Sequence, residues 1–128
     1  MRTKFEIEFT LNTPVRVLYD RLSTPEGLSE WFADNVTVDG DIFTFHWNKS
    51  EAKARLVYAR ENKAVRFDWL DVTDTETNFF EFRIIVHELT NDTALIITDH
   101  AEEDEIEDSR ELWNTEVSYL KKILGITE

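Results

Sequence analysis

No cysteine occurs in the sequence. The chain therefore forms no disulfide, offers no thiolate nucleophile and has no cysteine ligand for zinc. A cysteine-free composition fits the reducing environment of the cytoplasm. Residues 1–6 alternate polar and apolar side chains, unlike the continuous apolar segment of a signal peptide. We therefore expect a cytoplasmic protein.

Glycine and proline are scarce as well, at 3 and 2 residues, and the 128-residue chain contains no flexible linker, low-complexity tract or repeat. Apolar runs stay far below the roughly 20 residues that a membrane-spanning helix needs. A chain of this length buries roughly two-thirds of the surface that its unfolded form exposes. We expect one domain over residues 1–128, with its own hydrophobic core and no membrane insertion.

Basic residues are also few. The chain has 14 Lys and Arg residues and 27 Asp and Glu residues, which gives a formal net charge of −13. Such a chain repels phosphate backbones, which argues against nucleic-acid binding. The acids of residues 102–111 lie before and at the start of a predicted helix, and carboxylates at a helix N-terminus interact favourably with the helix dipole. The same acids could also bind a cation or a basic partner surface.

The motifs of familiar enzymes are missing. The sequence has no glycine-rich phosphate loop and no Gly-x-Ser-x-Gly nucleophile elbow. His46, His87 and His100 belong to different predicted strands and lack the short spacing of a zinc site. Asp99 and His100 are adjacent, so a strand would direct them to opposite faces. We assign no catalytic residue, metal site or cofactor.

The regular patterns that are present predict an antiparallel sheet. Residues 3–11 alternate strictly, as a half-buried strand does. Thr13-Pro14 and Thr24-Pro25 then each begin a short helix, and we expect the second to carry Leu28, Trp31 and Phe32. Further strands follow after residues 39–41, joined by short polar turns that favour hairpins; we predict them at residues 42–48, 52–60, 64–70, 78–89 and 93–101.

A long helix closes the chain. Residues 108–111 match a capping box, and Gly125 occupies the position of a C-terminal cap. The apolar residues Ile106, Trp113, Val117, Leu120 and Leu124 fall on one face of this helix. The fold class is therefore α+β, a curved antiparallel sheet wrapped around a long C-terminal helix, with two short helices after the first strand.

Glu116 falls on the same helix face and would point toward the sheet. A carboxylate at that position must be paired, hydrated or protonated. Three interpretations stay open: a stripe-edge residue that reaches water or pairs with a strand arginine such as Arg66 or Arg83, a polar anchor in a ligand cavity, or a general acid or base.

Aromatic residues are abundant, with 9 Phe, 4 Trp and 3 Tyr. Phe79 and Phe80 are adjacent, so one of them must leave the inner face, and an outward apolar patch there would suit a homodimer interface. The candidate ligand-binding residues combine aromatic side chains from alternating strand positions with one face of the helix: Phe45, Trp47, Phe67, Trp69, Phe82, Trp113, Glu116, Val117 and Leu120.

The segment of residues 13–32, with Thr13-Pro14, the Thr24-Pro25-Glu26 turn and the Trp31-Phe32 pair, resembles START-like proteins. It is most similar to the branch named for activators of the heat-shock-90 chaperone ATPase. The resemblance covers nearly the whole chain and implies a helix-grip fold, as in the Bet v 1-like (SRPBCC) superfamily. It also implies a cavity between sheet and helix, which in various members holds lipids, sterols, polyketides or hormones.

Three functions follow from these patterns and this resemblance. The first is a binding module for a small apolar or lipid-like molecule, held between the sheet and the C-terminal helix. The alternative is an interaction protein, either a homodimer or a co-chaperone-like adaptor that acts through its acidic surface. An enzyme of the cyclase or hydrolase type is the third.

Overall fold

The computed structural model describes residues 2–70 and 78–126. Its strands form one antiparallel sheet in the order β1-β7-β6-β5-β4-β3-β2, so the first strand lies beside the last and the others follow as a meander. The predicted fold class is confirmed. In chain order the elements are β1 (Arg2–Thr10), α1 (Val15–Ser23), α2 (Pro25–Leu28), β2 (Asn35–Asp39), β3 (Ile42–Trp47), β4 (Ser50–Arg60), β5 (Ala64–Trp69), β6 (Phe79–Val86), β7 (Thr93–Glu102), the 3₁₀ turn η1 (Glu103–Glu105) and α3 (Ile106–Leu124).

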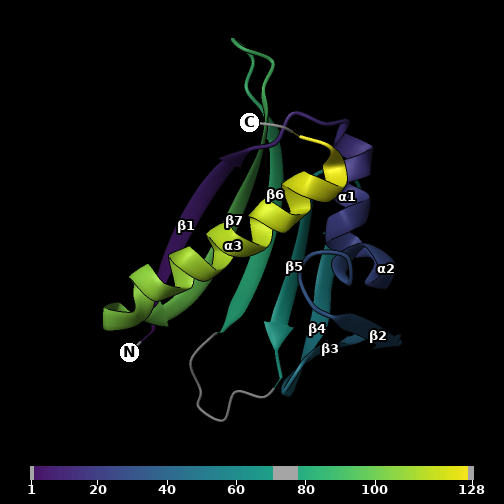
Figure 1. The fold of residues 1–128 in the computed structure, drawn as a ribbon, viewed down its shortest axis with the longest axis vertical. Helices are drawn as coiled ribbons and strands as arrows, with labels where there is room; N and C mark the ends of the chain where they lie inside the picture. The colour runs from purple at the N-terminus through teal and green to yellow at the C-terminus, as the bar shows by residue number, and fades with distance from the viewer. Residues whose placement is uncertain (1, 71–77, 127–128) are drawn as a thin grey trace.

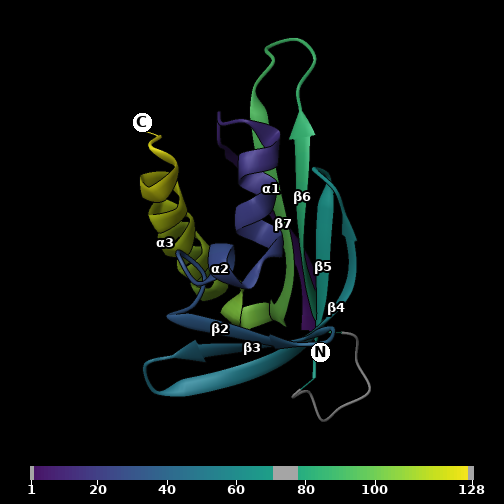
Figure 2. The same ribbon diagram turned by 90° about the vertical axis from the view of Figure 1, so that its right-hand side faces the viewer.

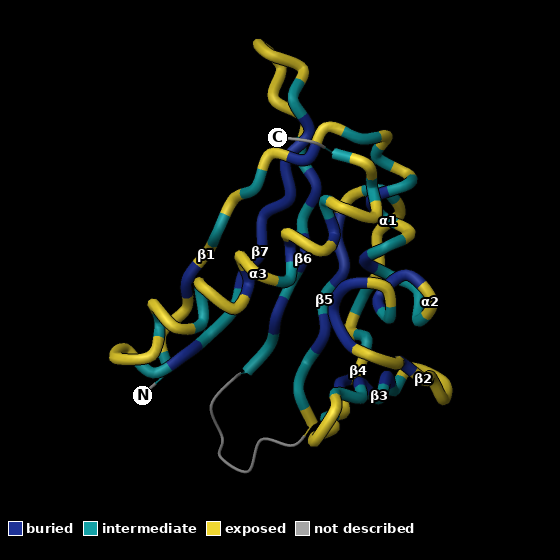
Figure 3. The backbone as a smooth tube through the Cα atoms, viewed as in Figure 1, coloured by how far each residue is buried: buried dark blue, intermediate teal, exposed yellow. Residues whose placement is uncertain are grey.

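All three α-helices lie on one side of the sheet. Helix α3 runs diagonally across the sheet face, while β2 and β3 bend beneath α1 and α2 (Figures 1 and 2). Buried positions follow the middle of the sheet, and the solvent side of α3 is exposed (Figure 3). The core therefore lies between the sheet and the helices, as the alternation of the strands predicts.

The second Thr-Pro signal works as predicted, but the helix it starts is short. Thr24 Oγ1 accepts a hydrogen bond of 2.9 Å from the Gly27 N–H, and Pro25 is the first helical residue. The helix ends at Leu28, so Trp31 and Phe32 lie in the turn that follows and not on the helix. Both are buried, because they pack into the core from an irregular segment.

Strand β2 was not predicted from the sequence. It lies at the edge of the sheet, and only Val36 among its residues is buried. Val36 and Val38 alternate with polar residues, but the pattern covers only five residues. Gly40, at a φ of 65°, turns the chain from β2 into β3. The predicted turns at Asn62 and Asn91 contain residues with positive φ, whereas the predicted turn of residues 71–77 lies outside the described residues.

The predicted start of the long helix is wrong by three residues, which is nearly one turn. Helix α3 begins at Ile106, directly after η1, so residues 108–111 lie inside it and form no capping box. Glu107 and Asp108 instead occupy the first turn, where their charge complements the helix dipole. Gly125 at a φ of 74° ends the helix, and its N–H bonds the Lys122 carbonyl, which confirms the predicted C-cap.

Gly27 in α2 lies against the last turn of α1. A Cβ atom at this position would lie 2.4 Å from the Asp20 carbonyl oxygen and 2.6 Å from the Arg21 Cα. Gly27→Ala is therefore expected to lower the free energy of unfolding by about 3 kcal/mol, the upper end for overpacking against backbone. Urea unfolding measures this change. Glu26→Ala, an exposed neighbour, should stay within about 0.5 kcal/mol; equal effects of the two changes would refute the close packing of α1 and α2.

Candidate functional site

An aromatic cluster occupies the space between the sheet and α3. The Phe67 and Phe80 rings stack with their centroids 5.0 Å apart, and the Trp113 ring of α3 stacks on Phe32 at 5.7 Å. Of the residues predicted to contact a ligand, six are buried in this core: Phe45, Phe67, Phe82, Trp113, Val117 and Leu120. Trp69 is partly buried against Phe80, with the ring centroids 4.8 Å apart. In the described part of the chain these side chains pack against one another.

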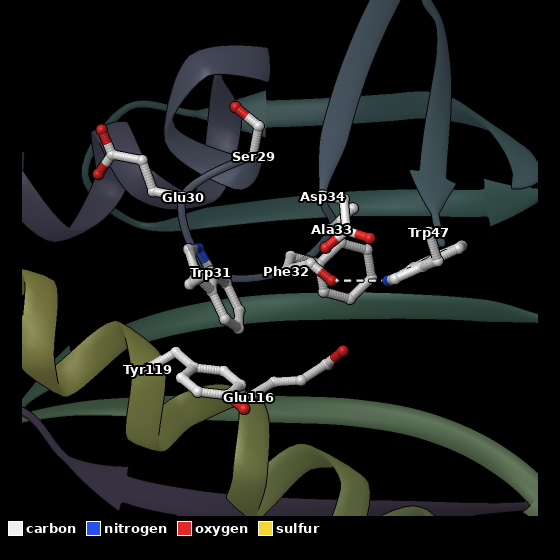
Figure 4. Close-up of a pocket in the computed structure, with 9 residues that line it drawn as sticks. All are labelled: Ser29, Glu30, Trp31, Phe32, Ala33, Asp34, Trp47, Glu116 and Tyr119. Carbon is white, nitrogen blue, oxygen red and sulfur yellow. Dashed lines mark hydrogen bonds between the residues drawn. The ribbon is translucent and has the colours of Figure 1, made fainter. Parts of the chain in front are cut away.

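A pocket with a volume of about 290 Å³ opens at the side of this core. It lies between α3 and the irregular segment that joins α2 to β2 (Figure 4). Two of the predicted ligand-binding residues, Trp47 and Glu116, line it. The full lining is Ser29, Glu30, Trp31, Phe32, Ala33, Asp34, Trp47, Glu116 and Tyr119.

Hydrogen bonds to the backbone fix the two tryptophan walls. The Trp31 indole N–H donates to the Arg21 carbonyl at 2.9 Å, and the Trp47 indole N–H donates to the Phe32 carbonyl at 3.0 Å. Both polar edges are thus satisfied by the protein. Trp31 is buried and Trp47 is partly buried, so the indole surface that a ligand can reach belongs mainly to Trp47. The pocket is therefore rigid and aromatic on these two sides.

Glu116 extends from α3 toward the pocket, and its carboxyl group lies across the pocket from Trp31 and Trp47 (Figure 4). Burial, with a smaller contribution from the nearby Asp99 charge, raises the pKa of Glu116 from its ordinary value of 4.5 to about 8. The side chain is therefore mainly a neutral carboxylic acid at pH 7. In this form it both donates and accepts hydrogen bonds.

The arginine partners that we expected for Glu116 lie elsewhere. The Arg66 guanidinium stacks on the Phe79 ring, 3.5 Å from its centroid, and Arg83 lies 4.0 Å from Glu6. Both arginines alternate with buried residues along β5 and β6, so their side chains leave the opposite face of the sheet. Neither arginine reaches the pocket.

Asp99 is a second carboxyl group on the inner face, and it was not among the site residues predicted from the sequence. Its Oδ2 accepts a hydrogen bond of 2.9 Å from the Trp113 indole N–H, and its Oδ1 accepts one of 2.8 Å from the His100 N–H. Burial raises its pKa despite these hydrogen bonds. Asp99 could have been predicted from the sequence, because Leu95, Ile97 and Asp99 alternate along β7 and therefore lie on the same, inner face.

His100 lies on the other face of the sheet from Asp99, as expected for adjacent strand residues. Its Nδ1 is 3.0 Å from the Phe79 carbonyl oxygen. His87 bonds Glu8 at 2.7 Å, and His46 lies 3.4 Å from Glu51. No group of three or more acidic or histidine side chains in residues 2–70 and 78–126 could hold a metal ion.

The rim of the pocket is acidic. Glu30 and Asp34 are exposed there, and Glu30 pairs with the Arg21 guanidinium at 2.9 Å. Arg21 also bonds Asp20 at 2.9 Å, so its charge is shared between two carboxylates. No Lys, Arg or His is found among the described residues that line the pocket. Its local electrostatic potential is therefore negative.

A curved antiparallel sheet that holds a long C-terminal helix against its concave face defines the helix-grip class of proteins. The family model of the START-like superfamily domain matches residues 1–126, and the chain belongs to this superfamily. No curated protein matches the sequence. Among the described residues, no helix is both long and apolar enough to cross a membrane.

Solved structures of similar proteins agree with this assignment. The protein BfR322 from Bacteroides fragilis is 38% identical, with a TM-score of 0.66 over 99% of this chain and 94% of that one. The Aha1 dimer from Colwellia psychrerythraea is 18% identical, with a TM-score of 0.80 over 95% of this chain and 96% of that one. DynU16, a protein of the dynemicin biosynthetic locus, is 12% identical, with a TM-score of 0.79 over 95% of this chain and 47% of that one.

Proposed function

We propose that the protein is a binding module for a small, largely apolar molecule, which it holds in the pocket between α3 and residues 29–34. The observation that carries this proposal is a pocket with four aromatic residues in its lining, into which the partly buried carboxyl group of Glu116 projects. Ligand sites are typically concave and apolar, with a few polar groups that orient the ligand.

The size of the pocket limits the ligand. A volume of about 290 Å³ lies at the lower end of the range of roughly 300–1,000 Å³ that is usual for small-molecule sites. The buried aromatic cluster separates this volume from the rest of the interior, so the pocket suits a compact ring system and leaves no room for a long acyl chain. A structural neighbour from a biosynthetic locus, DynU16, is compatible with such a ligand.

Native mass spectrometry of freshly purified protein, followed by denaturation, tests the proposal directly. We expect an excess mass that disappears on denaturation and identifies the ligand. N-phenyl-1-naphthylamine, an uncharged apolar dye, serves as a second probe because its fluorescence rises when it leaves water. We expect the dye to bind the purified protein once any ligand has been removed.

The site can be located with two variants of the same helix. Tyr119 lines the pocket and is 50% exposed, whereas Leu112 is 66% exposed on the same helix and does not line it. Tyr119→Ala should weaken dye binding about fivefold, because part of an aromatic contact is lost. Leu112→Ala should leave the affinity unchanged. Absence of both a bound mass and dye binding would refute the proposed function.

A protein-interaction role is the second candidate, favoured by an apolar strip on α3. Leu112, Tyr119 and Ile123 are exposed and recur at helical spacing on one side of this helix. The neighbour from Colwellia psychrerythraea is described as a dimer. The same native spectra would report a dimer mass, and Leu112→Glu should abolish it if the strip forms the interface.

A further inference from the structure

Building on the proposed function, we propose that the ligand is an organic cation, a compact aromatic or alicyclic body that carries an ammonium group. The observations that lead to this class are the charge of the pocket, its aromatic walls and the position of Glu116 between them.

The charge distribution excludes anionic ligands first. Glu30, Asp34 and Glu116 line the pocket without any basic side chain among its described lining residues. The Arg21 charge next to the rim is already shared by Asp20 and Glu30. A carboxylate or phosphate ligand would therefore lose its hydration without gaining a counter-charge. The overall charge of −13 adds a long-range attraction for cations.

The aromatic walls supply the attraction at short range. A cation placed over the face of Trp, Tyr or Phe is stabilised by the ring quadrupole, and most strongly by Trp. Four aromatic residues line the pocket in Figure 4. Trp31 and Phe32 are packed into the core, so the rings that a cation can reach are those of Trp47, which is partly buried, and Tyr119, which is exposed. Because the two indole N–H groups are bound to backbone carbonyls, the polar edges of these rings do not compete for the ligand.

Glu116 provides the polar end of the site. The charged and titratable groups near it are Asp99 from β7, Glu30 and Asp34 from the segment after α2, and Tyr119 from its own helix. Burial and the nearby Asp99 charge disfavour a negative charge on Glu116. A cation beside Glu116 would reverse that balance, so its carboxyl group would ionise and release a proton when the ligand binds.

Three probes of nearly equal shape test the ligand class: 2-naphthylmethylammonium, 2-naphthylmethanol and 2-naphthoate. Isothermal titration calorimetry at pH 7 and low salt should show the ammonium binding at least about tenfold more tightly than the alcohol, as expected for a desolvated cation over aromatic rings. The naphthoate should not bind measurably. Titrations in phosphate and in Tris should differ in enthalpy by the amount that corresponds to release of nearly one proton.

Two variants separate the role of Glu116 from a general effect of charge. Glu116→Gln keeps the shape of the side chain and should reduce the preference for the ammonium over the alcohol to less than about threefold, because the carboxyl group that pairs with the cation is gone. It should also abolish the dependence of the enthalpy on the buffer. Glu111→Gln makes the same replacement at an exposed position of the same helix and should change neither quantity.

The outcomes distinguish this inference from the proposed function. Equal or tighter binding of the alcohol would overturn the cation class and leave the binding module intact. A tenfold preference that survives in Glu116→Gln would overturn the role of Glu116. Failure of all three probes, together with failure of N-phenyl-1-naphthylamine, would overturn the proposed function itself.

Discussion

Glu116→Gln is expected to stabilise the protein at pH 9 by up to about 5 kcal/mol and to have little effect at pH 4.5. The pKa of Glu116 is about 8 in the folded protein and has its ordinary value of 4.5 in the unfolded chain. Between these values the folded state holds a proton that the unfolded state has lost. The free energy of unfolding therefore decreases as the pH rises from 4.5 to 8, by about 1.4 kcal/mol per pH unit, and is constant above 8.

Glutamine removes this dependence because it carries no ionisable proton. Urea unfolding of the wild type and of Glu116→Gln at pH 5, 7 and 9 should give curves whose separation increases with pH. Glu111→Gln, at an exposed position of the same helix, should follow the wild type at each pH. A separation between Glu116→Gln and the wild type that does not change with pH would contradict a protonated, buried Glu116.

Asp99→Asn tests how the Asp99 charge contributes to the raised pKa of Glu116. Asparagine keeps a side-chain oxygen that can accept the hydrogen bond from the Trp113 indole, and it removes the like charge that raises the pKa of Glu116. The pKa of Asp99 itself is raised by burial, so its own ionisation also lowers stability as the pH rises. We therefore expect this variant to lose less stability than the wild type between pH 5 and pH 9.

The sheet and the long helix were predictable because their residues repeat. Phe43 and Phe45 in β3 and Phe80 and Phe82 in β6 recur at every second position, and these four residues are buried on the inner face. The C-terminal helix repeats its apolar residues at helical spacing and ends at a glycine with positive φ. Strand β2 has the same repeat over only five residues, Val36 and Val38 between polar residues, and was missed.

The pocket could be predicted only in part. Trp47 lies on a strand with clear alternation and Glu116 on an amphipathic helix, so both were selected from the sequence. Trp31 and Phe32 were read as residues of a helix, and their packing against β3 and α3 depends on the path of an irregular segment. Whether aromatic side chains fill a cavity or line it depends on packing in three dimensions, which periodicity does not encode.

The adjacent residues Phe79 and Phe80 offer the strongest test of which strand face is buried. The Phe80 side chain is fully buried, and its ring lies 5.0 Å from Phe67 and 4.8 Å from Trp69. Phe80→Ala should lower the free energy of unfolding by about 4 kcal/mol, the loss typical of a phenylalanine removed from a packed core. Urea unfolding at pH 7 measures it.

Phe79→Ala is the matched control, because the same atoms are removed one position away. The Phe79 ring lies on the opposite face, between the Arg66 guanidinium and the His100 ring, and is only partly buried. Its loss should cost about 1 kcal/mol, mainly the cation–π contact. If Phe79→Ala were the more destabilising change, β6 would have the opposite face inward. The aromatic core that supports the pocket would then be assembled from different residues, and the proposals for Glu116 would lose their structural basis.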